Sequence, residues 1–363
     1  MTALSPFTRP RALRQFATLS TLFVVAGGLA WHGARSAKSV AKPVIEHALR
    51  SLEKNAAWAE RGLVHRVIDI PAAAGASSAA GVRSETLRYL DVPSLAPPRR
   101  DRAPLPPLVF LHDSPGSSCE WVNVIFGGQG AADTTYDGLL EAQHSIRAFE
   151  LPGHGVAPEA ESVPSSSMLA DTVAAALRAL GGGPAILIGA GRGGEIAVRV
   201  AALAPELVAK LVLLSPTGIA AAGSVRGPGV AASPDDFDAD AYREVSVDGV
   251  RRSVAISSYR APTDDEVAEQ LFVRQNARNW ATSVGLALEE RDRPDRLATI
   301  LPRVTQPVLL VFGSLDRRRP VGSYGQRFAA ALPNVRLATI DACGSRPHVE
   351  CPDRVIKVID GFR

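Results

Sequence analysis

Five short segments of the chain combine glycine with side chains that can do chemistry. A nucleophilic reaction needs a nucleophile, a base that carries its proton and an acid that orients the base. Histidine, aspartate and serine are present in these segments, so the spacing of the segments decides whether nucleophilic catalysis is possible. The segments are Leu-His-Asp-Ser-Pro-Gly at 111–116, Glu-Leu-Pro-Gly-His-Gly at 150–155, Gly-Ala-Gly-Arg-Gly-Gly at 189–194, Gly-Ser-Leu-Asp at 313–316 and Gly-Ser-Arg-Pro-His at 344–348.

The elements that must position these segments are buried strands that alternate with helices. Continuous apolar runs of four to six residues predict strands covered on both faces, which is typical of a parallel sheet. Two earlier runs, 62–70 and 85–92, predict an antiparallel pair. The predicted parallel strands are 108–111, 146–149, 185–189, 211–214, 308–312 and 335–340, and the predicted helices of this region are 166–180, 193–204 and 353–362.

In this order and spacing, the five segments resemble the landmarks of the α/β-hydrolase superfamily, in particular the capped branch of epoxide hydrolases, haloalkane dehalogenases and carbon–carbon bond hydrolases. They resemble, in turn, the oxyanion loop, the D-x-P-G-x-G turn, the nucleophile elbow, the acid loop and the histidine loop. The resemblance spans residues 62–363. It implies an α/β-hydrolase fold, a mainly parallel sheet flanked by helices, with an inserted helical lid.

The residues that carry the chemistry in this family are changed at three positions. The elbow pattern G-x-S-x-G has Gly191 at the nucleophile position, and glycine has no side chain with which to attack. The pattern G-H-x-x-H-x-E has Ser345 where the family has its catalytic histidine, and serine does not carry protons near neutral pH. In the oxyanion loop Asp113 replaces a small glycine, and its charge would oppose a developing oxyanion.

The other site positions have ordinary structural interpretations. Asp316 occupies the acid position. Because it has no histidine to orient, we expect it to cap its loop or to form a salt bridge beside residues 317–319. His348 matches the family's second, structural histidine, with a substitute base as the minor alternative. His112 and Arg192 complete the oxyanion region. We expect Arg192, Arg317 and Arg346 to be exposed and unrelated. Because their loops meet at one end of the sheet, a site for an anion or an acidic partner is the alternative.

The N-terminal region differs in character from the rest. Its basic residues flank an apolar stretch, 16–31, before the first acidic residue at Glu46, which favours an uncleaved membrane anchor over residues 14–31. A cleaved secretory signal is the competing interpretation, and the basic, acid-free leader also resembles a mitochondrial presequence that stays attached. The predicted organisation is an anchor segment 1–43, a connecting helix 44–61, a first core part 62–219, a lid 220–305 and a second core part 306–363.

Composition excludes several classes of function. The chain has 363 residues and a formal charge of +3, with 40 basic and 37 acidic residues interspersed, so no nucleic-acid footprint is present. Cys119, Cys343 and Cys351 show no metal-ligand spacing and are expected to be thiols rather than a disulfide framework. No cofactor and no metal site is predicted.

The three changed positions predict that the chain is not an enzyme, since triad members act as a unit. We therefore expect a non-catalytic, membrane-anchored accessory subunit of a mitochondrial inner-membrane complex, either respiratory or ATP-synthesising, with the secretory pathway or a bacterial membrane as alternative locations. Its partners would be the protein subunits of that complex. Two alternatives stay open: a pseudo-hydrolase that binds a lipid or small apolar ligand between lid and core, and a hydrolase with relocated residues, for example His348 and Cys351.

Overall fold

The computed structural model describes most of the chain beyond residue 62. The N-terminal anchor, 1–43, and the connecting helix, 44–61, that the sequence predicts lie outside the described residues, and none of the helices that are described is long and apolar enough to cross a membrane. The four boundaries between the five predicted segments stay predictions. The described residues are 63–70, 85–92, 105–129, 135–139, 144–155, 157, 163–181, 183–220, 246–275 and 277–363.

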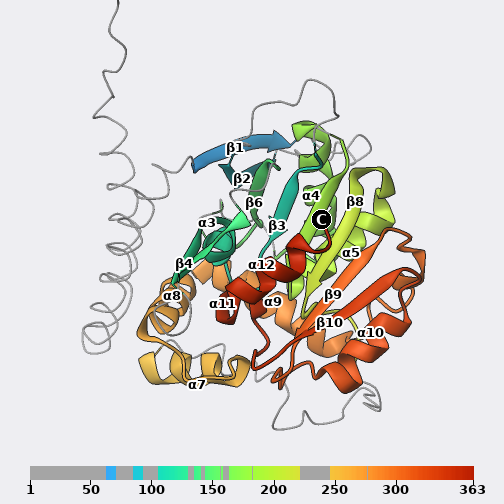
Figure 1. Ribbon diagram of the computed structural model, residues 1–363. Helices are drawn as coiled ribbons and strands as arrows, with labels where there is room; N and C mark the ends of the chain where they lie inside the picture. Colours follow the sequence, from blue (N-terminus) through green and yellow to red (C-terminus); the bar gives the residue numbers. More distant parts are fainter. Residues whose placement is uncertain are drawn as a thin grey trace, which may run out of the picture.

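One eight-stranded sheet organises the described residues (Figure 1). Its strand order is β1-β2-β6-β3-β7-β8-β9-β10. β1 pairs antiparallel with β2 and β2 with β6, and every later neighbour is parallel. The strands are β1 (Val64–Ile70), β2 (Glu85–Val92), β3 (Leu108–Leu111), β6 (Ile146–Glu150), β7 (Ala185–Ala190), β8 (Val208–Leu214), β9 (Val308–Gly313) and β10 (Val335–Ile340).

Helices cover both faces of this sheet because alternate residues of each strand point to opposite sides. In β3, Val109 and Leu111 pack with α4 (Ser166–Leu180), α5 (Arg192–Leu203) and α10 (Gln326–Ala330). Leu108 and Phe110 pack with α3 (Val122–Phe126) and α12 (Pro352–Asp360) on the other face. All four residues are fully buried, so the apolar run of this strand reflects a sheet with two covered faces.

Three helices follow the sixth strand of the sheet along the chain. They are α7 (Val247–Ser257), α8 (Asp264–Gln275) and α9 (Ala277–Asp292), and they precede β9. Four valine and leucine side chains of α7 and α8 form a small core of their own. Leu286 of α9 joins the main core, so α9 connects this group of helices to the sheet.

The sequence did not predict the small elements between β3 and β6. The described residues there form α3 and a short hairpin of β4 (Gly127–Gln129) and β5 (Thr135–Asp137). Strands of three residues give no readable alternation of apolar and polar residues, which explains why they were missed. The remaining short helical elements are η1 (Ser118–Trp121), η4 (Pro205–Leu207), η5 (Leu301–Arg303), η6 (Val321–Gly325) and α11 (Pro347–Glu350).

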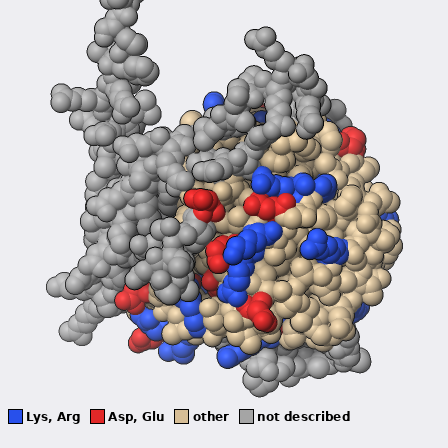
Figure 2. Space-filling view, viewed as in Figure 1, with Lys and Arg blue, Asp and Glu red and all other residues tan. Residues whose placement is uncertain are grey.

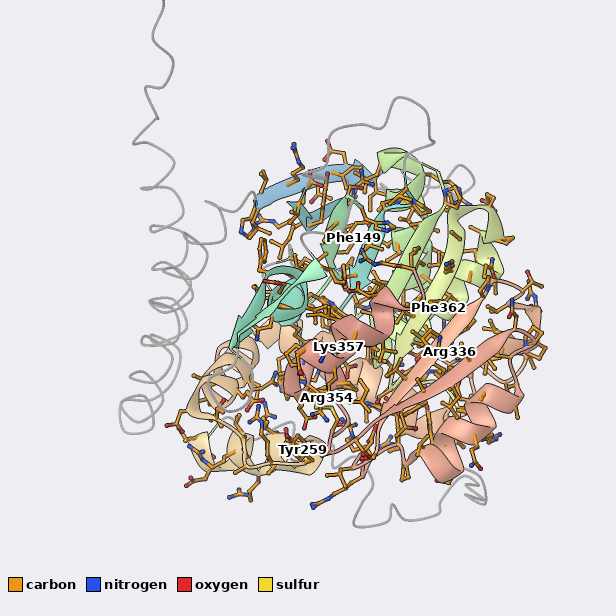
Figure 3. All side chains as sticks on the ribbon, in the orientation of Figure 1. Phe149, Tyr259, Arg336, Arg354, Lys357 and Phe362 are labelled. Atoms are coloured by element: carbon orange, nitrogen blue, oxygen red, sulfur yellow. A yellow bond between two sulfur atoms is a disulfide. The ribbon has the colours of Figure 1, made fainter. Side chains whose placement is uncertain are left out.

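Charged side chains are mixed rather than segregated on the visible surface. Figure 2 shows acidic and basic groups next to one another on the face that it presents. The interior is filled by aliphatic and aromatic groups, as where Phe149 of β6 meets Tyr89 of β2 with 5.9 Å between ring centroids (Figure 3). An edge-to-face pair of this kind adds specificity to the join between the antiparallel and parallel parts of the sheet.

The prediction that Cys343 and Cys351 are thiols was wrong. The two residues form a disulfide across eight positions of sequence, with their Cα atoms 6.2 Å apart. Counting cysteines could not show this pairing, since the last strand and the final helices bring the two positions together. The disulfide closes the loop that carries Ser345 and His348.

Replacing both cysteines by serine is expected to lower stability by about 2–3 kcal/mol, since the closed loop is short and the reduced chain regains its freedom in the unfolded state. Urea unfolding of the double variant against wild type measures the difference. Cys119→Ser is the matched control, because Cys119 is exposed, and it should leave the unfolding midpoint unchanged. An unchanged midpoint in the double variant would contradict a contribution of the disulfide to stability.

Candidate active site

The carboxyl ends of the central parallel strands bring the predicted landmarks together at one edge of the sheet. The oxyanion loop follows β3, the elbow follows β7 and the acid loop follows β9. Strands β3 and β7 pair directly in parallel, with Leu111 opposite Gly189. The first residues after both strands must therefore lie side by side, which is how an open α/β sheet builds a site.

The elbow itself is a sharp strand-to-helix turn. Gly191 has φ +48° and ψ −112°, a backbone conformation that residues other than glycine rarely adopt. The following helix packs closely against β3, because a Cβ at Gly193 would lie 2.2 Å from the carbonyl oxygen of Leu111. Glycine at these two positions permits both the turn and the close approach.

Asp113 reaches into the elbow from the neighbouring loop. Its Oδ1 accepts a hydrogen bond of 2.8 Å from the backbone N–H of Ser114 and one of 2.7 Å from the backbone N–H of Arg192. A Cβ built on Gly191 would lie 2.1 Å from the Asp113 Cγ and from each carboxylate oxygen. The carboxylate therefore fills the space of a side chain at residue 191, held by two converging N–H groups. The sequence had predicted only repulsion from this charge.

His112 fixes the start of the same loop. Its Nδ1 donates to the backbone oxygen of Asp113 at 2.7 Å, and its Nε2 accepts from the backbone N–H of Leu151 at 3.0 Å. These two partners require a neutral ring with its proton on Nδ1. His112 is fully buried and acts as a positioning residue for Asp113.

A serine and a histidine meet beside Asp113. Ser114 Oγ lies 2.9 Å from His154 Nε2, and His154 Nδ1 lies 3.1 Å from the backbone oxygen of Pro152. Since the carbonyl can only accept, Nδ1 carries the proton and Nε2 accepts the serine hydroxyl proton. Burial lowers the pKa of His154 to about 3, helped by His112, so this ring is neutral near pH 7. The sequence did not single out His154.

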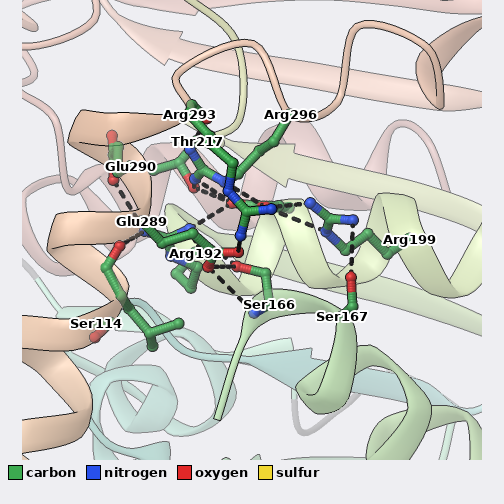
Figure 4. A network of polar contacts seen from close by, with 12 residues as sticks. Ser114, Ser166, Ser167, Arg192, Arg199, Thr217, Glu289, Glu290, Arg293 and Arg296 are labelled. Carbon is green, nitrogen blue, oxygen red and sulfur yellow. Dashed lines mark hydrogen bonds and ion pairs between the residues drawn. The ribbon is translucent and has the colours of Figure 1, made fainter. Parts of the chain in front are cut away.

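Behind the elbow lies a buried network of ion pairs (Figure 4). Arg192, which the sequence predicted to be exposed, is 2% exposed and donates to Glu195 at 2.7 Å. The same guanidinium donates to Glu290 and to the backbone oxygen of Leu286, both on α9. The prediction failed because two of the partners of Arg192, Leu286 and Glu290, lie on a helix almost a hundred residues later in the chain.

Glu195 is the centre of this network. It accepts hydrogen bonds from Arg192, Arg199, Arg296 and the hydroxyl of Thr217. Burial by itself would raise the pKa of Glu195, but the surrounding guanidinium groups hold it far below its usual range. The carboxylate is therefore always ionised, and it ties α5, which starts at the elbow, to α9 and the chain that follows it.

The acid loop and the histidine loop contain no histidine in contact with Asp113. Asp316 Oδ1 accepts from the backbone N–H groups of Arg318 and Arg319, which is a capping role. His348 is buried, hydrogen-bonded at 3.1 Å to Glu120 Oε2 and stacked on Trp121 at 4.6 Å between centroids.

His348 and Cys351 do not form the relocated catalytic pair that the sequence offered as an alternative. Cys351 is in the disulfide with Cys343 and carries no thiol. His348 does not line either of the cavities described below. Ser345, at the family's histidine position, is also buried.

Two small cavities adjoin the Asp113 carboxylate. Their volumes are about 10 Å³ and about 30 Å³, which is room for one or two water molecules. Asp113, Ser114 and Arg318 line both cavities. The smaller one is also lined by Arg192, Thr217, Ser283, Leu286, Ala287, Glu290 and Arg319, and the larger one by Pro115, Ser253, Val254, Gln270, Arg274 and Arg346.

A larger open groove of about 590 Å³ lies on the outer side of the ion-pair network. Its walls include Ser165, Arg199, Arg293 and Arg296. Neither Asp113 nor any residue of the elbow lines it, so we assign the chemistry to the two smaller cavities despite their size.

Comparison with known proteins identifies the family. Residues 108–358, more than half of the chain, match the Alpha/beta hydrolase family. The chain belongs to this family. A solved membrane phospholipase A is similar in structure, with a TM-score of 0.64 at 21% identity over 96% of this chain and 98% of that one. The epoxide hydrolase CorEH has a TM-score of 0.61 at 22% identity, covering 83% of this chain and 98% of its own.

Curated relatives of this α/β hydrolase are bacterial enzymes. The 2-hydroxy-6-oxononadienedioate/2-hydroxy-6-oxononatrienedioate hydrolase of Pseudomonas sp. is 24% identical over 69% of this chain and 91% of its own length. The pimeloyl-[acyl-carrier protein] methyl ester esterase of Aromatoleum aromaticum is 28% identical over 65% and 96%.

These relatives contradict the functional predictions made from the sequence. The expectation of a non-catalytic accessory subunit was wrong, because the relatives are named hydrolases and esterases. The expectation of a mitochondrial membrane location was wrong as well, because the relatives are bacterial. The sequence pattern shows only the side chain that stands at each family position, whereas the Asp113 carboxylate enters the space above Gly191 from a neighbouring loop.

Gly191→Ala is expected to destabilise the α/β hydrolase by about 2–4 kcal/mol, since the added Cβ meets the Asp113 carboxylate and the turn has positive φ. Chemical denaturation measures the change. Gly322→Ala is the matched control, because a Cβ there meets nothing within 4 Å. Equal stability of the two variants would show that the carboxylate does not occupy the elbow.

The Glu120 carboxylate predicts a specific pH dependence. Burial would raise its pKa, but Arg346 and His348 lower it to about 2. Because the pKa of Glu120 is lower in the folded than in the unfolded protein, its ionised carboxylate stabilises the fold above the unfolded pKa near 4.5. This stabilisation is lost as the pH falls from 4.5 toward 2. Glu120→Gln should lower the free energy of unfolding by about 3 kcal/mol at pH 7 and by progressively less below pH 4.5.

Urea unfolding between pH 3 and pH 7 measures this dependence on Glu120. Glu206→Gln serves as the control, because Glu206 is exposed and its ion pair with Arg178 lies at the surface. A Glu120→Gln penalty that stays constant across this pH range would refute the assignment of the ion pair.

Proposed function

We propose that this protein is a hydrolase in which the Asp113 carboxylate is the nucleophile. The observation that carries the proposal is the position of this group, which fills the space of the missing side chain at Gly191. Carboxylates are established covalent nucleophiles. The family and the named activities of the curated relatives support hydrolysis as the type of reaction.

The two oxygens of the carboxylate have different surroundings. Oδ1 accepts both backbone hydrogen bonds, from Ser114 and Arg192. The described residues provide no hydrogen bond to Oδ2, and Asp113 lines both cavities. Oδ2 is therefore the oxygen that attacks a substrate placed there, while the N–H groups of Ser114 and Arg192 keep the carboxylate in position.

This arrangement favours attack at saturated carbon over attack at an ester carbonyl. An ester carbonyl develops its own oxyanion, which needs N–H donors, but Oδ1 of Asp113 already occupies the two donors at the elbow. An epoxide carbon needs no such stabilisation. We therefore propose cleavage of a carbon–oxygen bond at saturated carbon, with an epoxide as the simplest substrate.

The proposed reaction has two steps. First, Oδ2 bonds to a ring carbon of the epoxide, the ring carbon–oxygen bond breaks, and the released oxygen takes a proton. Then water adds to the carbonyl carbon of the Asp113 ester. The negative charge formed on Oδ1 is stabilised by the two backbone N–H groups. The bond from this carbon to Oδ2 then breaks, Oδ2 leaves as a hydroxyl of the diol with one proton of the water, and the oxygen of the water stays in the carboxylate.

One proton is taken up in the first step and one is released from water in the second. The Ser114 hydroxyl, which is hydrogen-bonded to His154, lines both cavities and can pass these protons. The low pKa of His154 makes it a weak base, so the second step is expected to be slow and the ester of Asp113 to accumulate.

We further propose that helices α7–α9 act as a lid. The two cavities are too small for a substrate of several carbon atoms, and Gln270, Arg274 and Leu286 of α8 and α9 close them. Entry therefore requires these helices to move away from the elbow. The ion pairs of Arg192 with Glu289 and Glu290 would open in that movement.

A second candidate function is a serine hydrolase that uses Ser114 as nucleophile and His154 as base. The 2.9 Å contact between their side chains favours it. The occupied N–H groups at the elbow argue against it, because an acyl oxyanion would have to displace Asp113. The two candidates differ in the residue that carries the covalent intermediate.

The test is a single turnover of styrene oxide in water labelled with ¹⁸O, followed by mass spectrometry of the peptide that contains Asp113. The proposal expects a gain of one ¹⁸O at Asp113. Asp113→Asn should lower turnover by about 1000-fold or more. Asp171→Asn is the matched control, because Asp171 is exposed on α4, and its turnover should equal that of wild type.

The proposal is overturned if the label is absent from Asp113, if Asp113→Asn keeps its activity, or if the wild-type protein does not turn over epoxides. Hydrolysis of p-nitrophenyl butyrate that is lost in Ser114→Ala, together with an acyl group on Ser114, would establish the second candidate instead.

A further inference from the structure

The cavity beside Asp113 contains a buried arginine whose hydrogen-bonding capacity is not used. Arg319 is 4% exposed, and its Nε and Nη2 have no hydrogen-bond partner among the described residues. It lines the cavity of about 10 Å³ together with Asp113 and Ser114. A guanidinium group stays charged at every physiological pH, and leaving its N–H groups unpaired inside a protein is costly.

The two unpaired nitrogens lie on one edge of the guanidinium group. Nε–H and one N–H of Nη2 point in the same direction, and this pair is the fork that binds the two oxygens of a carboxylate side by side. The backbone of Arg319 is held in the acid loop, because its N–H donates to Asp316 Oδ1 at 2.9 Å. The side chain itself is buried, and close packing around a buried side chain restricts its rotamers.

Nearby carboxylates balance the charge of Arg319 without using its fork. Burial lowers the pKa of Arg319, and Asp316, Asp113 and Glu290 raise it, with a net increase. These residues act through charge, since none of them accepts a hydrogen bond from the Nε or Nη2 groups. A further carboxylate that reached the fork would gain two charge-assisted hydrogen bonds.

Other arginines surround the same space. Arg318 lines both cavities, and Arg274 and Arg346 line the cavity of about 30 Å³. They come from the acid loop, from α8 and from the histidine loop. In that cavity Asp113 is the single carboxylate among the described residues of the lining. Arg346 is paired with Glu120, so Arg274 and Arg318 leave an excess of positive charge that favours an anionic occupant.

We infer that the Nε–Nη2 edge of Arg319 binds a carboxylate group of the substrate, so that this hydrolase acts on small molecules that carry a carboxylic acid. The inference rests on the proposed function in taking the bound molecule to be a substrate, whereas the binding site itself does not depend on that function. The bound carboxylate would hold the reacting carbon next to Asp113 Oδ2. Arg319 is then a specificity-determining residue.

Binding of butyrate and of butyramide, its neutral analogue, tests the inference without any turnover. Ligand-observed NMR titration of the wild-type protein is expected to give a Kd on the order of millimolar for butyrate and at least about tenfold weaker binding for butyramide. Arg319→Gln should weaken butyrate binding by at least about tenfold. Arg336→Gln is the matched control, because Arg336 is exposed on β10 (Figure 3), and its Kd should match that of wild type.

Arg319→Lys separates the fork from its charge. Lysine keeps the positive charge but cannot make two parallel hydrogen bonds, so butyrate binding should weaken nearly as much as in Arg319→Gln. Thermal unfolding of each variant checks that it is folded, and the lysine variant serves if the glutamine variant is not. Equal binding of butyrate and butyramide, wild-type affinity in Arg319→Lys, or no butyrate binding at all would overturn the inference.

Because the readout is binding, its failure is distinct from failure of the proposed hydrolysis. A protein that binds butyrate through Arg319 but turns over neither styrene oxide nor the epoxide acid glycidate would retain the acid-binding site and lose the proposed reaction. A protein that hydrolyses styrene oxide through Asp113 but binds butyrate and butyramide equally would retain the reaction and lose the acid-binding site.

Discussion

The hydrogen bonds from two backbone N–H groups to Asp113 Oδ1 are the interaction on which the site depends. The donors come from the loop after β3 and from the first residue of α5, which are brought together by the parallel pairing of β3 with β7. The carboxylate joins these two segments and takes the space above Gly191. Glycine at the elbow is thus the counterpart of aspartate in the loop, since the Asp113 carboxylate could not keep its place if residue 191 had a side chain.

A second constraint follows from the charges behind the elbow. Removing a carboxylate and several guanidinium groups from water is costly unless each is paired. Glu195 satisfies this condition with three arginines and Thr217. Through Arg192 the same cluster reaches Glu289 and Glu290 of α9. The position of α5, which sets the elbow, is therefore coupled to the helices that cover the cavities.

The loop that contains Ser345 and His348 is packed into the core. Glu120 engages His348 and Arg346, and the ring of His348 lies on Trp121. The disulfide closes the same loop. Asp113 is connected to this group, since its backbone N–H points to Glu120 at 3.4 Å. This loop therefore supports the loop that carries the carboxylate.

The sequence by itself determined the fold and the location of the site. Apolar runs such as 108–111 and 185–190 mark strands buried on both faces, and the glycine turn at 189–193 marks the elbow, because these features depend on neighbouring residues alone. Only the tertiary structure decided what the site contains. Asp113 meets Gly191 across 78 positions of sequence, Ser114 meets His154 across 40, and Arg192 meets Glu290 across 98. Contacts between residues so far apart in the sequence depend on how strands pair and helices pack. The space above a glycine can therefore be filled by a side chain from another loop.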